Sequence, residues 1–122
     1  MKTVFVLEPD AILAKQYVAA LDAYDVRVFN TASSAIKAFE QTVPDVVVLE
    51  LALPGHGGFE FLYEMISYLD TAHVKVVINS SVQPDAVPWG IINRDDLQIV
   101  EHLYKPKTSV EDLLQVIKEA ST

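Results

Sequence analysis

The sequence contains no cysteine, only four glycines among its 122 residues, and a single tryptophan. Without cysteine the protein has no disulfide, no thiolate metal site and no cysteine nucleophile, although this says little about its compartment. No apolar run approaches the length of about 20 residues that a membrane-spanning helix requires. The N-terminus Met1-Lys2-Thr3 leads directly into an apolar strand, without a small-residue cleavage site, so no signal peptide is expected.

Basic residues are also scarce. Nine Lys and Arg stand against seventeen Asp and Glu, which gives a formal net charge of −8. Such a balance repels phosphate backbones and anionic lipid, so direct binding to nucleic acid or to a membrane surface is not expected. Apolar residues make up 51% of the chain, enough for a packed core. We therefore expect one cytoplasmic domain that spans residues 1–122.

Short apolar runs rich in Val, Ile and Phe alternate with segments of helical period, which is typical of βαβ units. Five strands are predicted, at Thr3–Leu7, Val26–Phe29, Val46–Leu49, Val74–Ile78 and Ile99–Leu103. Helices are predicted from about Asp10 to Ala23, after a cap at Thr31 or Ser33, from about Phe59 to Leu69, and after a capping box at Thr108–Glu111. Strands that alternate with helices predict an α/β fold with a three-layer α/β/α sandwich.

The segment Ser80–Gln98 is the hardest to interpret. Pro84, Pro88 and Gly90 disfavour a long helix, so one short or broken helix is expected there. Trp89 lies between Pro88 and Gly90, and two interpretations stay open. It is either a core residue or an exposed anchor for a partner protein.

Polar side chains follow several of the predicted strands. Glu8 follows the first strand, Glu50 the third, Ser80 the fourth and Lys105 the fifth. In open α/β sheets the functional groups gather beyond the carboxyl ends of the strands. The two carboxylates, the hydroxyl and the ammonium are therefore expected to converge on one edge of the sheet.

These residues lie within stretches that resemble the response-regulator receiver family over essentially the whole chain. The matching stretches are Val4–Asp10, Pro44–Gly55 followed by Gly58, Val76–Ser81, and Leu103-Tyr104-Lys105-Pro106. The resemblance implies a flavodoxin-like, doubly wound, five-stranded parallel sheet in the order 2-1-3-4-5. It also implies a role in phosphorelay signalling between proteins of two-component systems.

Receivers of this family hold Mg²⁺ with an acidic pair after strand one, an acceptor aspartate after strand three and a carbonyl two residues later. A Ser or Thr and a lysine then bind the phosphoryl group. The resemblance assigns these roles, in order, to Glu8, Glu50, Ala52, Ser80 and Lys105. The aromatic switch position falls on His102, which period-two alternation puts on the same side of its strand as Val100 and opposite Ile99, Glu101 and Leu103.

Two positions depart from the family's pattern. Pro9 replaces the second acid, and Glu50 replaces the acceptor aspartate. Asp10 lies one residue further on, where the start of the helix is expected to direct it elsewhere. Mg²⁺ needs near-ideal oxygen geometry, and the extra methylene of Glu50 displaces its carboxylate by about 1.5 Å. No cofactor is expected, and Mg²⁺ could bind only weakly, through Glu8, Glu50 and Ala52.

The sequence therefore predicts a degenerate receiver, not an enzyme, that binds other signalling proteins without being phosphorylated. A Glu50–Lys105 ion pair is expected to replace the metal and the phosphoryl group. Two alternatives stay open: a conventional receiver phosphorylated on Glu50 or Asp10, and a flavodoxin-like binder of a small ligand. A homodimer is compatible with the resemblance, because receivers commonly dimerise.

Overall fold

The computed structural model describes residues 1–55, 57–67, 73–87 and 98–122. Five parallel strands form one sheet in the order β2-β1-β3-β4-β5. They are β1 (Thr3–Leu7), β2 (Asp25–Phe29), β3 (Val46–Leu49), β4 (Lys75–Ser80) and β5 (Gln98–Tyr104). The flavodoxin-like fold and its strand order are confirmed.

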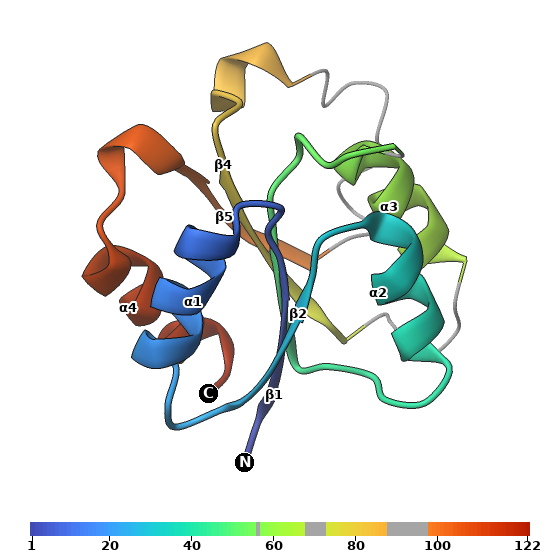
Figure 1. The fold of residues 1–122 in the computed structure, drawn as a ribbon, viewed down its shortest axis with the longest axis horizontal. Helices are drawn as coiled ribbons and strands as arrows, with labels where there is room; N and C mark the ends of the chain where they lie inside the picture. The colour runs from blue at the N-terminus through green and yellow to red at the C-terminus, as the bar shows by residue number, and fades with distance from the viewer. Residues whose placement is uncertain (56, 68–72, 88–97) are drawn as a thin grey trace.

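Helices cover both faces of this sheet. They are α1 (Ala11–Ala20), α2 (Ala32–Phe39), α3 (Gly58–Ile66) and α4 (Val110–Ala120). Helices α1 and α4 lie on one face, and α2 and α3 lie on the other (Figure 1). The three-layer α/β/α arrangement is therefore also confirmed.

Alternation along the inner strands divides the core between the two faces. Phe5 and Leu7 pack on the side of α2 and α3, whereas Val4 and Val6 pack on the side of α1 and α4. All four side chains are buried. A strand buried on both faces needs a continuous apolar run, and the middle strands have one.

Capping side chains fix where three helices begin. Asp10 caps α1, and Thr31, one of the two caps predicted, caps α2. The cap predicted for the last helix is wrong by one residue: Ser109 caps α4 and forms a capping box with Asp112, rather than Thr108 with Glu111. The reason is that the hydroxyl of Thr108 donates to the carbonyl of Tyr104 instead, at 2.7 Å.

A bulge in β5 overturns the predicted orientation of His102. The register of β5 on β4 passes from Ile99 directly to Glu101, so Val100 is an extra residue. Ile99 consequently packs on the side of α2 and α3, and Leu103 on the side of α1 and α4. His102 is paired with Ile78 and lies on the same face as Ile99. The expectation that it points away from Ile99 was wrong.

The described part of the segment after β4 contains one 3₁₀ turn, Pro84–Ala86. The rest of the predicted broken helix, with Pro88, Trp89 and Gly90, lies outside the described residues, as does Leu69 at the predicted end of the third helix. Within the described ranges, no helix has both the length and the apolar character needed to cross a membrane.

Candidate functional site

The carboxyl ends of four strands bring the predicted polar residues together. Glu8 directly follows β1 and Glu50 directly follows β3, and the N–H of Glu50 donates to the carbonyl of Leu7 at 3.1 Å. This bond continues the ladder between β1 and β3, so the two glutamates leave the sheet side by side. Ser80 ends β4, and Lys105 begins the 3₁₀ turn after β5. The convergence predicted from the sequence is present.

The carboxylate of Glu50 is buried, with 4% of its side chain exposed, and accepts five hydrogen bonds. Its Oε1 accepts from Nζ of Lys105 at 2.7 Å and from both N–H and Oγ of Ser81, at 3.1 and 3.2 Å. Its Oε2 accepts from Oγ of Ser80 and from N–H of Ala52, the latter at 3.1 Å. Both oxygens are therefore surrounded by donors.

Lys105 bridges the two buried carboxylates. Its Nζ lies 2.7 Å from Oε1 of Glu50 and 2.7 Å from Oε1 of Glu8, and 17% of its side chain is exposed. The second oxygen of Glu8 accepts from N–H of Asp10 at 3.1 Å. One ammonium thus neutralises half of the charge of two buried acids, and backbone and hydroxyl donors stabilise the rest.

The surroundings shift the pKa values of this pair apart. Burial alone raises the pKa of Glu50, but the hydrogen bonds from Lys105, Ser80 and the backbone outweigh it, so the pKa lies below its ordinary value. Burial alone lowers the pKa of Lys105, but hydrogen bonds and charges of Glu50 and Glu8 raise it above its ordinary value. The hydrogen bonds and charges, unlike burial, favour the charged forms of both residues.

Glu8, Glu50 and Lys105 form an ion cluster. Hydrogen bonds connect this ion cluster to the loop after β4 and to β5. Besides donating to Glu50, Oγ of Ser80 accepts from N–H of Val82 at 3.0 Å. The carbonyl of Val82 lies 3.0 Å from Nε2 of His102. Because a carbonyl can only accept, Nε2 carries the proton in this contact. The two predicted switch positions, Ser80 and His102, are therefore both in contact with the same loop residue.

Glycine is required where the loop after β3 returns to start α3. A Cβ at Gly58 would lie 2.7 Å from Cα of Leu51 and 3.2 Å from the carbonyl oxygen of Glu50. The N–H of Gly58 donates to the carbonyl of Leu51 at 2.8 Å. This close approach fixes the backbone that carries Glu50. Gly55, two residues after Leu53, has a φ of +72°, which glycine adopts without strain.

Mg²⁺, which the sequence resemblance implies, does not fit the residues of this site. The ammonium of Lys105 occupies the space between the carboxylates of Glu8 and Glu50. Pro9 offers no carboxylate, and the carboxylate of Asp10 caps α1 by accepting from N–H of Ile12 and Leu13. Among the residues that the structure describes, no group of three or more His, Cys, Asp or Glu side chains could hold a metal ion.

Three residues in or near the site have polar contacts that were not predicted from the sequence. Ser81 gives two hydrogen bonds to Glu50, and only its position after Ser80 could have indicated this. Asn79, inside an apolar strand, donates to the hydroxyl of Tyr17 at 3.1 Å. Burial raises the pKa of Tyr17. A polar residue within a buried strand was the available signal for this pair.

Comparison with known proteins gives one curated relative. No protein-family model matches the chain. The chain is 31% identical over 111 residues to the protein-glutamate methylesterase/protein-glutamine glutaminase 2 of Oleidesulfovibrio alaskensis. The match covers 87% of this chain and 30% of the relative, so the chain spans less than a third of that protein's length.

Solved structures match along almost the entire chain. The non-phosphorylated HemR receiver domain from Leptospira biflexa aligns with a TM-score of 0.81 and 21% identity, over 100% of this chain and 95% of that one. A CheY-like response regulator receiver domain protein from Methanospirillum hungatei gives 0.79 and 18%, over 98% and 92%. A sensor protein from Polaromonas gives 0.84 and 17%, over 98% and 95%. The chain therefore has the fold of response-regulator receiver domains, which confirms the fold that the sequence resemblance implied.

Proposed function

We propose that the chain is a degenerate receiver: a signalling module that binds partner proteins without metal-dependent phosphoryl transfer. The observation that carries this proposal is the position of Lys105, 2.7 Å from both Glu8 and Glu50. The lysine that binds a phosphoryl group in the family is here engaged by carboxylates of the chain itself. The module is not an enzyme in this proposal, and it acts in the cytoplasm on other signalling proteins.

Chemistry at Glu50 supports the same proposal. An acceptor carboxylate must have an oxygen free to attack phosphorus, whereas both oxygens of Glu50 accept hydrogen bonds. A lowered pKa and an ammonium partner make this carboxylate a weaker nucleophile. Breaking these contacts would also leave buried charges without partners, which is strongly unfavourable.

In this proposal the carboxylate of Glu50 replaces the phosphoryl group as the partner of Ser80 and Lys105. Its side chain is one methylene longer than aspartate, and its oxygens bind Ser80 and Lys105, the two residues that grip a phosphoryl group in the family. The loop after β4 is therefore held permanently by a carboxylate that belongs to the chain. Partners would recognise one fixed conformation of that loop, and their binding would not depend on phosphorylation.

Incubation with acetyl phosphate and Mg²⁺, followed by intact-mass and peptide mass spectrometry, tests this function. We expect no phosphoryl adduct on the wild-type protein. A conventional receiver in the same reaction shows that the phosphodonor is active. A phosphoryl group mapped to Glu50 or Asp10 of the wild type would instead establish the conventional receiver.

The double variant Pro9→Asp/Glu50→Asp is the matched control. It restores the acidic pair after β1 and the shorter acceptor after β3, and leaves Ser80 and Lys105 unchanged. If these two positions account for the loss of phosphorylation, the variant gains an adduct on residue 50 that depends on Mg²⁺.

A further inference from the structure

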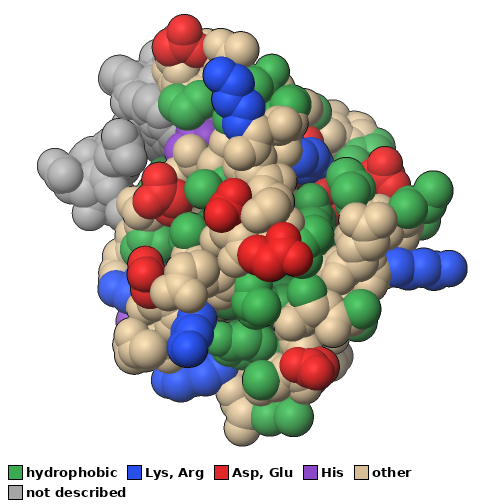
Figure 2. Space-filling model, turned by 90° about the vertical axis from the view of Figure 1, so that its left-hand side faces the viewer, with side chains coloured by type: hydrophobic (Ala, Val, Ile, Leu, Met, Phe, Trp, Pro, Cys, Tyr) green, Lys and Arg blue, Asp and Glu red, His purple; other side chains and the backbone are tan. Residues whose placement is uncertain are grey.

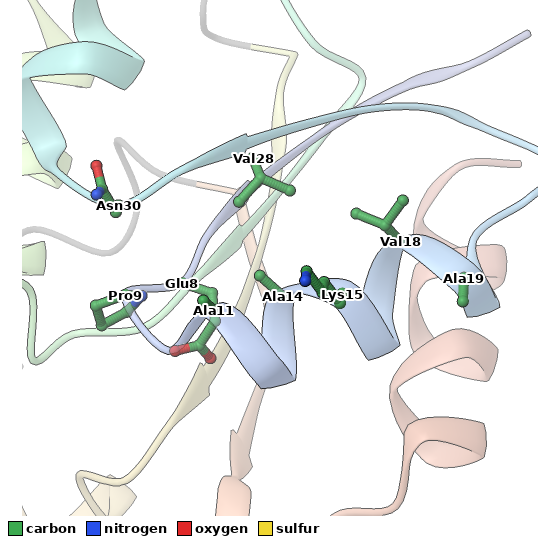
Figure 3. A pocket seen from close by; sticks show the side chains of 9 residues that line it. All are labelled: Glu8, Pro9, Ala11, Ala14, Lys15, Val18, Ala19, Val28 and Asn30. Atoms are coloured by element: carbon green, nitrogen blue, oxygen red, sulfur yellow. The ribbon is translucent and has the colours of Figure 1, made fainter.

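A groove of about 620 Å³ separates α1 from β2. Figure 3 shows Val18 of α1 and Val28 of β2 facing each other across it, and each is 41% exposed. Lys15 is the one charged residue of α1, and the exposed positions around it are apolar or small apart from Gln16. A helix that is apolar almost all round is normally buried. This side of the molecule therefore has the character of a covered surface.

The backbone of β2 is open on the side away from β1. β2 is an edge strand, and the backbone groups of its first and last residues point toward β1. The N–H of Asp25 donates to the backbone carbonyl of Lys2, and the carbonyl of Phe29 accepts from the backbone N–H of Glu8. Alternation along a strand then directs N–H and C=O of Val26 and Val28 outward. No backbone hydrogen bond between described residues reaches these two from the outer side.

The charged side chains on the edge of β2 are complementary to those of a second β2 strand. Asp25 and Arg27 lie on the face opposite Val26, and their side chains are 47% and 44% exposed and 3.8 Å apart. If a second β2 runs antiparallel with Val26 opposite Val26, each Asp25 faces an Arg27 of the other copy. If Val26 instead faces Val28, the two Arg27 side chains oppose each other. Opposite charges favour the first register and like charges disfavour the second.

We propose that two copies of this chain associate through β2, antiparallel and centred on Val26. The two-fold axis is perpendicular to the sheet, so both α1 helices lie on the same face of one continuous sheet. The two apolar grooves then open toward each other along the seam, and Val18 and Val28 of both copies are shielded from water.

The distribution of charge favours this side of the molecule for contact with a second copy. Two chains with a charge of −8 repel each other, and acidic side chains are spread over the face that α1 and α4 form, with apolar ones between them (Figure 2). Residues 11–20 of α1 contain no acid at all. The edge of β2 adds one acid and one base, so contact here brings few like charges together.

Single cysteine variants test the register. Because the chain has no cysteine, one introduced thiol can form a disulfide only between copies. In the proposed register the two copies of Val26 form a hydrogen-bonded pair, and such pairs have Cα atoms about 5.5 Å apart, within disulfide range. We expect Val26→Cys to form a covalent dimer under mild oxidation, and Arg27→Cys to form no disulfide between copies. Val100→Cys, on the exposed bulge of β5, measures random collisions.

A disulfide-linked dimer of Arg27→Cys, or a Val26→Cys protein that cross-links no faster than Val100→Cys, overturns the proposal.

Sedimentation equilibrium gives the second test. Arg27→Asp places four acids at the seam, and we expect it to weaken self-association at least about tenfold. The charge swap Asp25→Arg/Arg27→Asp restores the pairs and is expected to restore the dimer. A wild-type protein that stays monomeric at every concentration, or a swap that fails to restore association, contradicts it.

Discussion

At the scale of single residues, Lys105 connects the two buried glutamates. Its ammonium is shared between Glu8 and Glu50 and lies 2.7 Å from an oxygen of each. Buried ion pairs often add little net stability, because desolvation offsets the attraction. Removing one partner is much more costly than the pair is worth. The net contribution of the pair to stability is therefore expected to be smaller than the loss caused by removing one partner.

The substitution Lys105→Met tests this arrangement directly. Without the ammonium, Glu8 and Glu50 face each other as two buried like charges, so the pKa of Glu50 is expected to rise. The free energy of unfolding is expected to fall by about 3 kcal/mol, because the carboxylates lose their counter-ion. Carboxyl ¹³C NMR titration measures the first effect and urea denaturation measures the second.

Lys107→Met is the matched control, since Lys107 lies exposed in the same 3₁₀ turn. Its effects on both measurements are expected to be small. An unchanged titration of Glu50 in the Lys105→Met protein would show that the ion pair does not control this carboxylate.

At the scale of elements, local sequence determines most helix starts and fails where two candidate caps are adjacent. Thr108 and Ser109 can each accept from a backbone N–H, and each is followed three residues later by an acid, Glu111 or Asp112. The structure selects Ser109, because the hydroxyl of Thr108 donates to the carbonyl of Tyr104. That contact depends on how β5 ends, which no pattern within the helix reveals.

The substitution Ser109→Ala measures the cap of α4. It removes the oxygen that accepts from N–H of Asp112 at 3.0 Å, and we expect a loss of about 1 kcal/mol in the free energy of unfolding. Glu111→Ala, at the acid of the capping box first predicted, is the control. Urea denaturation that shows a larger loss for Glu111→Ala than for Ser109→Ala would contradict the assignment.

The bulge in β5 is the second feature that the sequence could not show. A strict alternation along Ile99–Leu103 predicts one face for Ile99 and Leu103, yet the two pack on opposite faces. One extra residue reverses the side of every residue after it. Nothing in the run of residues identifies Val100 as the extra one, because the register is set by pairing with β4. This is why the direction of His102 was predicted wrongly.

At the scale of the whole molecule, the alternation of strands and helices predicted the three-layer fold and the edge at which the site lies, and the resemblance to receivers implied the strand order. The carboxyl ends of parallel strands lie on one edge of the sheet, so the residues that follow the strands converge regardless of side-chain conformation. How those side chains meet was only partly predictable. The Glu50–Lys105 contact followed from charge and length, whereas the bridge to Glu8 and the two bonds from Ser81 depend on rotamers and on the path of the loop after β4.

The pKa shifts of the pair set a pH window for its contribution to stability. The pKa of Glu50 is below its ordinary 4.5 when folded, so its contribution is present above pH 4.5 and is lost as the pH falls through the folded value. The pKa of Lys105 is above its ordinary 10.5, so its contribution is complete below pH 10.5 and is lost as the pH rises through the folded value. Between these limits both contributions are constant.

Wild type and Glu50→Gln should therefore differ in free energy of unfolding by a constant amount around neutral pH. The difference is expected to shrink as the pH falls below 4.5, because the wild type then loses the charge that the variant never had. Urea midpoints measured at intervals of pH give this difference, and Glu119→Gln, at an exposed position of α4, controls for the loss of a surface carboxylate. A difference that widens in acid would mean that Glu50 binds its proton more readily in the folded protein, and the ion cluster would then not hold it charged.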